Sequence, residues 1–505
     1  LSEELILHFL PKMFKSYEIR EKALLRITRN ADIDTETIYD EDLDYRDAME
    51  NLIKQRRRMN PVRMELSRDL NKKMISSLCK ELHVDKEHVF LTRVPLDMSF
   101  VFGLQGYLRN TAQDKLFYQR RTPRMTPELD DKSALIPQIM KKDVLLSYPF
   151  ENIRSFINLL NEAAKDDSVV SIKMTLYRLA DKSQIVDALV EAAENGKEVT
   201  VLIELRARFD EQNNIDWSER LEEAGCRVIY GFDGYKVHSK ICLITYRSRG
   251  EIQYITQIGT GNYNEKTAAM YTDLSLMTAN PAIGKDAAEF FKNMSIGNLA
   301  GQYDYLIVSP TSLKQKILYL MDEEIKKGSN GRIIMKMNSV TDVDFIQKVS
   351  EASRSGVKVD LIVRGICCIL PGVTGYTDNV RVMSVVGRYL EHPRIFSFGS
   401  GNDQKIYIGS ADMMTRNTEK RVEVAAPILD QDIRRQINHY LKVMLSDNVK
   451  ARVLGSDGKY RRKEQKEPYI DSQNVFMQEA LQAKPPQEVP KKIGLLKRIG
   501  RIFSR

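Results

Sequence analysis

The chain has 505 residues, an apolar fraction of 42% and a formal net charge of +8. A chain of this length holds about three domains, and the apolar fraction is typical of globular proteins rather than of disordered or fibrous ones. The sequence contains no apolar run long enough to cross a bilayer as a helix and no signal-peptide pattern.

Residues 1–124 are predicted to form an α+β head domain. Helical periodicity occurs at 3–14 and again at 64–82, and the apolar stretch 23–28 between them is typical of a strand. The mixture of long helical patterns with a single strand-like run favours an α+β arrangement over a purely helical one.

Two opposed charge runs and a proline-containing stretch complete this region. The acidic run 32–44 and the basic run 54–58 are best explained as solvated faces of helices. The polar stretch 123–145 contains three prolines, a pattern that predicts a linker to the next domain.

An internal repeat of roughly 160 residues follows the head domain and extends to about residue 445. Each copy has a strand-like stretch, an amphipathic helix that ends in glycine and a second apolar strand, at 172–174, 185–196 and 197–206 in the first copy and at 335–337, 345–356 and 357–364 in the second. Such apolar runs are typical of buried parallel strands. We therefore predict two homologous α/β domains, 125–301 and 302–445, that share a cleft.

Each copy also contains a histidine followed two residues later by a cation. The pairs are His238 with Lys240 and His392 with Arg394, in a chain with only six histidines. Each pair precedes a strand-like stretch and a glycine turn. An imidazole can attack a phosphorus atom while a fixed cation neutralises the phosphoryl oxygens, so we predict that both histidines are catalytic.

Arginines follow the buried strands of both copies. Arg178, Arg206 and Arg208 stand at strand ends in the first copy, and Arg364 ends the corresponding strand in the second. Ligands of open parallel sheets bind at the carboxyl ends of the strands. A single arginine there is more often an ion-pair partner, but the recurrence predicts a cleft that binds a polyanion.

Two features near the histidines stay open from the sequence alone. The stretch 259–264 offers backbone N–H groups that suit an anion nest, although a plain turn explains it equally well. A carboxylate is expected to orient each imidazole, and Asp273 and Asp412 are both candidates.

The C-terminal part, 446–505, is predicted to be a polar linker followed by a basic tail. Residues 446–490 are highly polar and are expected to be extended or disordered. The last fifteen residues, 491–505, contain six basic residues and no acidic one, with apolar residues at helical spacing between them. This pattern fits contact with an anionic membrane or a polyanion, whereas its two glycines favour an unstructured terminus.

The combined motifs resemble the phospholipase D superfamily and, more closely, polyphosphate kinases of the first type. The phospholipase D motif continues with an aspartate, but Thr245 and Gly399 occupy those positions here, as is typical of the kinases. The resemblance covers about residues 1–445. The motifs that carry it are Thr175-Leu-Tyr-Arg178, Ala207-Arg-Phe-Asp-Glu211, His238-Ser-Lys240, Gly259-Thr-Gly-Asn-Tyr-Asn264, Tyr271-Thr-Asp273, Val386-Gly-Arg-Tyr-Leu-Glu-His392 and Ser410-Ala-Asp412.

The resemblance implies two tandem phospholipase D-like α/β domains and reversible transfer of the ATP γ-phosphate to inorganic polyphosphate, with Mg²⁺ and a phosphohistidine intermediate. It implies that His238 is the nucleophile and that His392 contacts phosphate and assists proton transfer. The other implied contacts are Tyr271 and Arg364 to the nucleotide, Lys240 and Arg394 to phosphate, and Arg178 and Arg208 to a magnesium–phosphate site through phosphate oxygens.

The resemblance also sets expectations for partners and location. ATP, ADP and polyphosphate are the expected partners of a homo-oligomer, with no specific nucleic acid. Reduced, mostly buried cysteines favour the cytoplasm, and the family allows peripheral contact with the inner membrane surface. Members of the family carry an N-terminal helical domain with an asparagine near the adenine, and this chain begins inside the following domain. We therefore expect either that the chain is truncated or that this domain was removed.

Two other functions compete with the kinase. A phospholipase D-like hydrolase of lipid or nucleic-acid phosphodiesters would use the same paired histidines, but the absent aspartates speak against it. A polyphosphate- or RNA-binding module would explain the arginines and the basic tail without turnover.

Overall fold

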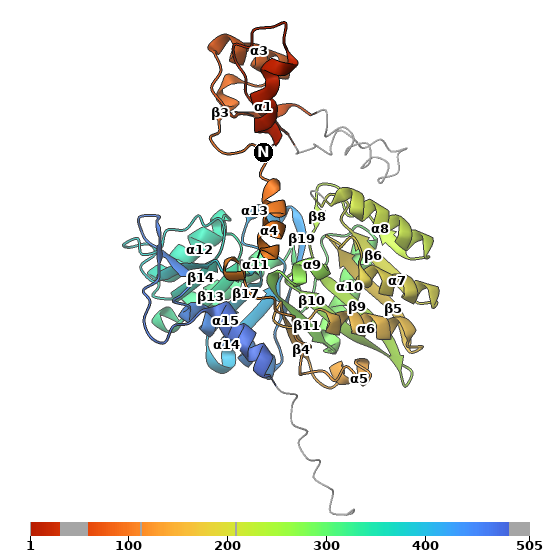
Figure 1. Ribbon diagram of the computed structural model, residues 1–505. Coiled ribbons are helices and arrows are strands. Elements are labelled where there is room, and N and C mark those ends of the chain that lie inside the picture. Colours follow the sequence, from red (N-terminus) through yellow and green to blue (C-terminus); the bar gives the residue numbers. More distant parts are fainter. Residues whose placement is uncertain (1, 31–58, 112–113, 208–209, 484–505) are drawn as a thin grey trace, which may run out of the picture. The chain divides into compact units, whose positions relative to one another are not determined.

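The computed structural model describes residues 2–30, 59–111, 114–207 and 210–483. The chain divides into two compact units, Leu1–Arg121 and Thr122–Arg505, each of which has its own sheets and core (Figure 1). The charge runs at 32–44 and 54–58 and the basic tail at 491–505 lie outside the described residues.

The smaller unit is a head of mixed helices and strands. Its sheet has the order β1-β2-β3, with β1 and β2 antiparallel and β2 and β3 parallel. A small core forms around Met64, Cys79 and Val84. The elements are α1 (Ser2–Met13), β1 (Leu25–Arg29), β2 (Pro61–Leu66), α3 (Lys72–Leu82), β3 (Val89–Leu91) and α4 (Phe100–Asn110).

The helix predicted at 64–82 is only partly correct. Residues 61–66 form strand β2, in which Met64 and Leu66 point to the core, and the helix begins at Lys72. The boundary is set by Asn71, whose side chain accepts a hydrogen bond from the Met74 amide and caps α3. The prediction missed this strand because the few alternately buried residues of β2 also fit the helical spacing of the longer stretch 64–82.

The first half of the larger unit is built on an eight-stranded sheet. Its strand order is β16-β11-β10-β9-β5-β6-β7, with β4 paired to β11. Strands β5, β6 and β7 are parallel. The elements are β4 (Val144–Tyr148), α6 (Arg154–Lys165), β5 (Val169–Leu176), α7 (Gln184–Glu194), β6 (Glu198–Ile203), α8 (Glu211–Glu223), β7 (Arg227–Ile229), β8 (Lys236–Val237), β9 (Ile241–Ser248), β10 (Glu251–Gly259), α9 (Glu265–Ala268), β11 (Tyr271–Thr278) and α10 (Pro281–Ser295).

The second half repeats this plan on a ten-stranded sheet. Its order is β12-β19-β18-β17-β13-β14-β15-β20-β21, with β8 paired to β19. Strands β13, β14 and β15 are parallel. The elements are β12 (Ile307–Ser309), α11 (Leu313–Ile325), β13 (Arg332–Met337), α12 (Val343–Arg354), β14 (Lys358–Val363), β15 (Val380–Val385), β16 (Leu390–Glu391), β17 (Arg394–Phe398), β18 (Lys405–Gly409), α13 (Thr415–Glu419), β19 (Arg421–Pro427), α14 (Gln431–Ser446), β20 (Ala451–Leu454), β21 (Tyr460–Arg462) and α15 (Ser472–Gln482).

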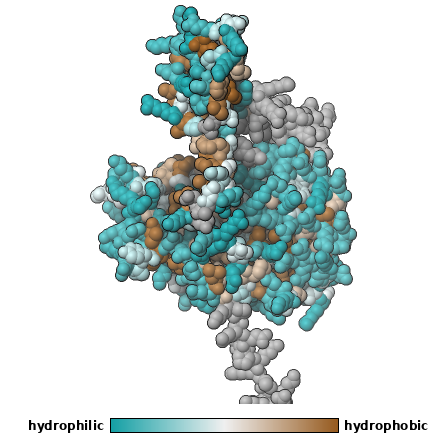
Figure 2. All heavy atoms as spheres, viewed as in Figure 1, coloured by the Kyte–Doolittle hydropathy of each residue, from teal (hydrophilic) through white to brown (hydrophobic). Residues whose placement is uncertain are grey.

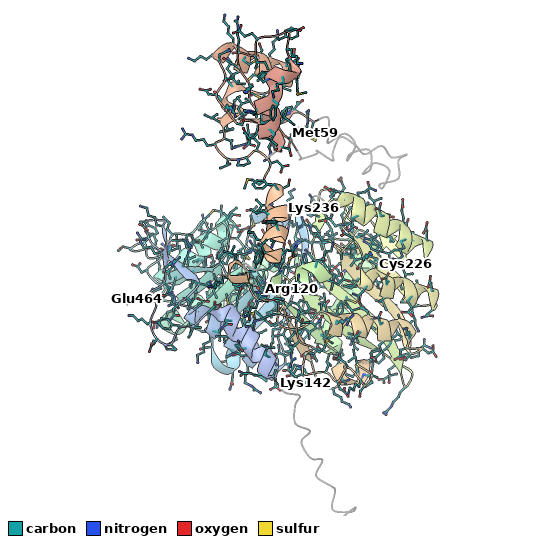
Figure 3. The ribbon with its side chains drawn as sticks, viewed as in Figure 1. Met59, Arg120, Lys142, Cys226, Lys236 and Glu464 are labelled. Atoms are coloured by element: carbon teal, nitrogen blue, oxygen red, sulfur yellow. The ribbon has the colours of Figure 1, made fainter. Side chains whose placement is uncertain are left out.

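The two halves exchange short strands. Strand β16 comes from the second half but pairs with β11 of the first sheet, and β8 comes from the first half but pairs with β19 of the second sheet. Apolar clusters also join the halves, one of which packs Leu145, Phe150 and Leu274 against α14 and α15. The outer edges, marked by Cys226 and Glu464 in Figure 3, lie at opposite ends of the unit. The exchanged strands therefore lie at the seam between the two halves.

The predicted fold class is confirmed: two tandem α/β domains follow an α+β head. The helix–strand repeat predicted from the sequence matches β5, α7 and β6 in the first half and β13, α12 and β14 in the second. The exact domain boundaries at 124, 301 and 445 stay predictions.

Two stretches that were expected to be linkers are instead packed. Within 123–145, Ile136 and Ile139 are buried, and the amides of Leu135 and Ile136 donate to the Glu162 carboxylate. The second stretch, 446–490, is described up to residue 483, and in that part β20 joins the second sheet and α15 buries Phe476 in the shared core. Their polar composition misled the prediction because a few apolar side chains anchor each stretch to a core supplied by other segments.

In the described part of the chain, none of the helices has the length and apolar character needed to cross a bilayer. The visible face of the larger unit is mainly hydrophilic, whereas apolar atoms gather on α4, where Phe102 and Tyr107 are exposed (Figure 2).

Candidate active site

His238 is held at the end of strand β8, whose first residue, Lys236, is labelled in Figure 3. The His238 amide donates to the carbonyl of Val422 on β19 at 2.9 Å, which extends the pairing between β8 and β19 by one residue. Its ring Nδ1 lies 2.9 Å from both carboxylate oxygens of Glu423. The first half therefore supplies this histidine, and the second half supplies the carboxylate that orients it.

His392 mirrors this arrangement from the other half. It follows strand β16, and its amide donates to Thr272 Oγ1 on β11 at 3.2 Å. Its ring Nδ1 lies 2.9 Å from both carboxylate oxygens of Asp273. Each imidazole is thus oriented by a carboxylate from the opposite half of the molecule.

The carboxylates determine which ring nitrogen can react. An ionised carboxylate only accepts hydrogen bonds, so a neutral imidazole facing it carries its proton on Nδ1. The lone pair is then on Nε2 in both His238 and His392. A histidine in this tautomer is a competent nucleophile towards phosphorus or a proton acceptor.

Burial keeps both imidazoles in the neutral form. Desolvation, reinforced by the positive charges of Lys240 and Arg421, lowers the pKa of His238 well below its usual value. Desolvation also lowers the pKa of His392, against the opposing effect of Asp273. Desolvation raises the pKa of Glu423, although Lys240 opposes the shift.

The cation of each motif lies beside its histidine. Lys240 is 1% exposed, and its ammonium group donates to the carbonyl of His238. Arg394 donates to the carbonyl of His392 at 2.9 Å and, across the seam, to the carbonyl of Thr260 at 3.0 Å. Arg394 and His392 also lower the pKa of His238, so the two motifs lie close enough to interact electrostatically.

Two tyrosines flank the imidazoles. The Tyr177 ring packs edge-on against the His238 ring with a centroid distance of 4.8 Å, and the Lys240 ammonium lies over the face of Tyr177. The Tyr271 ring lies 5.5 Å from that of His392. These rings restrict the orientation of both histidines.

Arg364 is held near the second histidine through a polar relay. Its Nε donates to Asn338 Oδ1 at 2.7 Å, the Asn338 amide donates to Asp412 at 2.6 Å, and Asp412 pairs with Arg394 at 3.1 Å. Asp412, one of the two expected orienting carboxylates, therefore contacts the cation rather than the imidazole.

The strand-end arginines of the first half have different fates. Arg178 pairs with Asp210 at 3.0 Å and lies next to Tyr177, which packs on His238. Arg206, which was expected to face the cleft, is instead bound to Glu204 and to the carbonyls of Phe232 and Tyr235. Arg208 lies outside the described residues.

The described residues do not form a protein-held magnesium site. No group of three His, Cys, Asp or Glu side chains among them is arranged to hold a metal ion. Arg178 pairs with the Asp210 carboxylate, and guanidinium groups do not ligate Mg²⁺. Arg178 is therefore suited to phosphate oxygens and not to direct coordination of the ion.

The glycine turn 259–264 makes room for a carboxylate. A side chain at Gly261 would place its Cβ 2.1 Å from an Asp273 oxygen. Thr260 Oγ1 donates to Asp273 Oδ1 at 2.6 Å from the same turn. The glycine therefore leaves room for Asp273 beside His392. The sequence had suggested an anion nest or a plain turn for 259–264, and neither includes this role.

Glu423 was missed in the sequence, although the repeat carried a signal for it. Asp273 and Glu423 are both the third residue of the strand that follows the glycine turn, in β11 and β19 respectively. Aligning these strands would have paired them. The signal was weak because one residue is an aspartate and the other a glutamate. In addition, each carboxylate contacts the histidine of the other half of the chain.

Three family models match most of the chain. A family model described as the polyphosphate kinase middle domain matches residues 1–104. Models described as polyphosphate kinase C-terminal domains 1 and 2 match residues 134–300 and 306–473.

Individual proteins give the same result. A polyphosphate kinase of Staphylococcus haemolyticus is 41% identical over 495 residues, which cover 97% of this chain and 68% of that protein. One from Bacillus cereus is 42% identical over 465 residues, covering 91% and 66%. The crystal structure of a Porphyromonas gingivalis polyphosphate kinase matches with a TM-score of 0.77 at 31% identity, covering 94% of this chain and 69% of that one. This chain spans about two thirds of the length of these relatives.

Proposed function

This chain belongs to the polyphosphate kinase family of phosphotransferases, and we propose that it reversibly transfers the ATP γ-phosphate to inorganic polyphosphate through a phosphohistidine. The observation that carries the mechanism is the contact between His238 Nδ1 and Glu423. It leaves Nε2 free to attack a phosphorus atom.

The reaction divides into two displacements. In the first, the Nε2 lone pair of His238 forms a bond to the γ-phosphorus, and the bond between that phosphorus and the β–γ bridging oxygen breaks, so that ADP leaves. In the second, a terminal oxygen of polyphosphate attacks the same phosphorus, and the bond to Nε2 breaks. Glu423 stabilises the cationic ring of the intermediate through Nδ1–H.

The neighbouring cations and His392 support these steps. Lys240 and Arg394 are proposed to neutralise charge on the transferring phosphoryl group, which is the main contribution a protein makes to this chemistry. His392, neutral and oriented by Asp273, is proposed to contact phosphate and to accept or return a proton at Nε2.

Nucleotide contacts are proposed for Tyr271 and Arg364, which lie beside His392 and Arg394. Arg178 and Arg208 are proposed to bind phosphate oxygens. Magnesium is treated as part of the substrate, as the complex of Mg²⁺ with ATP, because the described residues offer no cage for the ion.

The test is intact-mass analysis of the protein after incubation with ATP and magnesium, followed by peptide mapping. One acid-labile phosphoryl adduct is expected on His238, and His238→Ala is expected to abolish both the adduct and polyphosphate synthesis. His439→Ala is the matched control, because that ring lies on the exposed face of α14 and pairs with Glu479.

Two outcomes would contradict the proposal. One is an adduct on another residue with synthesis intact in His238→Ala. The other is the absence of an adduct with both ATP and polyphosphate as donors, because donation by polyphosphate does not require an adenine site. Cleavage of a phosphodiester substrate would instead point to the hydrolase alternative.

The remaining expectations stay proposals with their own tests. Homo-oligomerisation and peripheral contact with the inner membrane surface follow from the family resemblance alone. Sedimentation of the full chain, and its flotation with anionic vesicles before and after removal of residues 491–505, would test them.

A further inference from the structure

The segment just before His392 has little backbone support of its own. Strand β16 consists of Leu390 and Glu391 only, and pairs with two residues of β11. Two residues of parallel pairing cannot by themselves fix a catalytic side chain to the tolerance that phosphoryl transfer needs. Side chains must therefore hold this segment.

Gln473, on the C-terminal helix α15, makes three hydrogen bonds to this segment. Its Oε1 accepts from the Tyr389 amide at 2.9 Å, and its Nε2 donates to the Tyr389 carbonyl at 2.9 Å and to Glu391 Oε1 at 2.7 Å. The side chain is 1% exposed. Its amide thus pairs with Tyr389 as a neighbouring strand would.

The close fit extends to Gly387. A Cβ on that residue would lie 2.4 Å from Gln473 Oε1. The glycine therefore leaves the space that the glutamine amide occupies.

Glu391 links Gln473 to the carboxylate that orients His392. Its Oε2 lies 2.9 Å from Lys336 Nζ and accepts a 2.9 Å hydrogen bond from Thr272 Oγ1. Thr272 Oγ1 in turn accepts from the His392 amide, and Thr272 precedes Asp273. One buried network therefore joins α15 to both members of the His392–Asp273 pair.

Helix α15 is itself firmly anchored. The Ser472 amide and hydroxyl donate to the buried carboxylate of Asp447 at 2.8 and 2.7 Å. The Phe476 ring stacks on Tyr440 at 4.5 Å and contacts Phe150 at 5.5 Å. Gln473 thus extends from a fixed base.

We infer that Gln473 is a positioning residue, which holds His392 and Asp273 in the geometry for transfer through Glu391 and the 387–391 segment. This inference rests on the proposed function, because it assigns His392 a part in the reaction. It makes helix α15 part of the active site, although no residue of that helix needs to touch the substrate.

The main test compares Gln473→Leu with Gln478→Leu. Gln478 is exposed on the same helix, so the same chemical change there controls for a general effect on α15. Gln473→Leu is expected to lower kcat for polyphosphate synthesis by about 10- to 100-fold with little change in the KM for ATP. Gln478→Leu is expected to match the unchanged chain.

A second variant separates positioning from folding. In Gln473→Glu, two carboxylates face each other and share a proton, which raises the pKa of one of them. The protonated group can donate to Glu391 as the amide does, so relative activity is expected to rise as the pH falls below neutrality. Activity and Tm are measured over the same pH range. Because the folded protein binds the shared proton more tightly than the unfolded chain, Tm is expected to rise together with activity as the pH falls. A kcat that stays low while Tm recovers would contradict a positioning role.

A readout that does not require turnover distinguishes this inference from the proposed function. Hydrogen exchange of the peptide containing 387–391 is expected to be faster in Gln473→Leu than in Gln478→Leu. If the unchanged chain made no polyphosphate, the proposed function would be wrong. The exchange rates would still show whether Gln473 holds the 387–391 segment. Equal exchange and equal kcat in both variants would overturn the inference.

Discussion

The two halves of the larger unit hold equivalent histidines by different means. The residue that precedes His238 is Val237, which packs with Val422 in an apolar cluster. The Val237 amide donates to the buried Glu204 carboxylate at 2.7 Å. Before His392, the corresponding residue is Glu391, which is paired with Lys336 and held by α15.

The same fold therefore positions its two histidines in two ways, by apolar packing in the first half and by a buried ion pair in the second. Apolar packing of the Val237 side chain helps to position β8 without a buried ion pair at that residue. A buried ion pair seldom adds net stability, but it admits few alternative arrangements, so it can specify a geometry. The residue before the proposed nucleophile is thus held by apolar packing, and the residue before its partner histidine is held by buried polar groups.

The largest expected effect comes from equivalent lysines of the repeat. Lys336 is buried with Glu391, whereas Lys173 on β5 is 27% exposed and pairs with Glu198. We expect Lys336→Met to lower the free energy of unfolding by about 3–5 kcal/mol, because it leaves a buried carboxylate unpaired. Lys173→Met should change it by about 0–1 kcal/mol. Urea unfolding of both variants tests this. An equal decrease in the free energy of unfolding would contradict the difference between the two halves.

The orienting carboxylates allow a second comparison. Glu423→Gln should slow phosphorylation of His238 by ATP about 100-fold, because the amide can donate to Nδ1 and favour the wrong tautomer. Asp273→Asn should leave single-turnover phosphorylation closer to normal and lower steady-state synthesis instead. Rapid-quench measurement of the adduct separates the steps. Equal effects of both variants on adduct formation would contradict the division of roles.

The smallest expected effect concerns pH. The folded-state pKa of His238 is lowered, so its ring stays neutral where an ordinary histidine, with a pKa of about 6.5, would be protonated. Its phosphorylation rate should therefore not fall between about pH 7.5 and about pH 6. Single-turnover rates measure this directly, and a decline with an apparent pKa near ordinary histidine would exclude a shifted nucleophile.

The free energy of unfolding should depend on pH in the range where the phosphorylation rate does not. Because the folded pKa of His238 lies below its unfolded value, the unfolded chain binds more protons, and stability is lost as the pH falls below about 6.5. His238→Gln should flatten part of this dependence in urea titrations.

Patterns local in the sequence predicted much of the fold. The apolar runs and helix periods predicted β5, α7 and β6 and their counterparts β13, α12 and β14, because burial in a parallel sheet imposes its own composition. The failures were of another kind. Residues 446–490 were predicted to be a polar linker, although within the described part of that stretch β20 joins a sheet and α15 packs on a core made by distant segments.

The sequence by itself determined the repeat, the two histidines and the cations beside them, because each of these is written within a few adjacent residues. Only the tertiary structure decided which carboxylate each imidazole faces. His238 and Glu423 are 185 residues apart, and His392 and Asp273 are 119 apart. The exchange of β8 and β16 between the sheets brings them together, and no local pattern of hydrophobicity records such a long-range pairing.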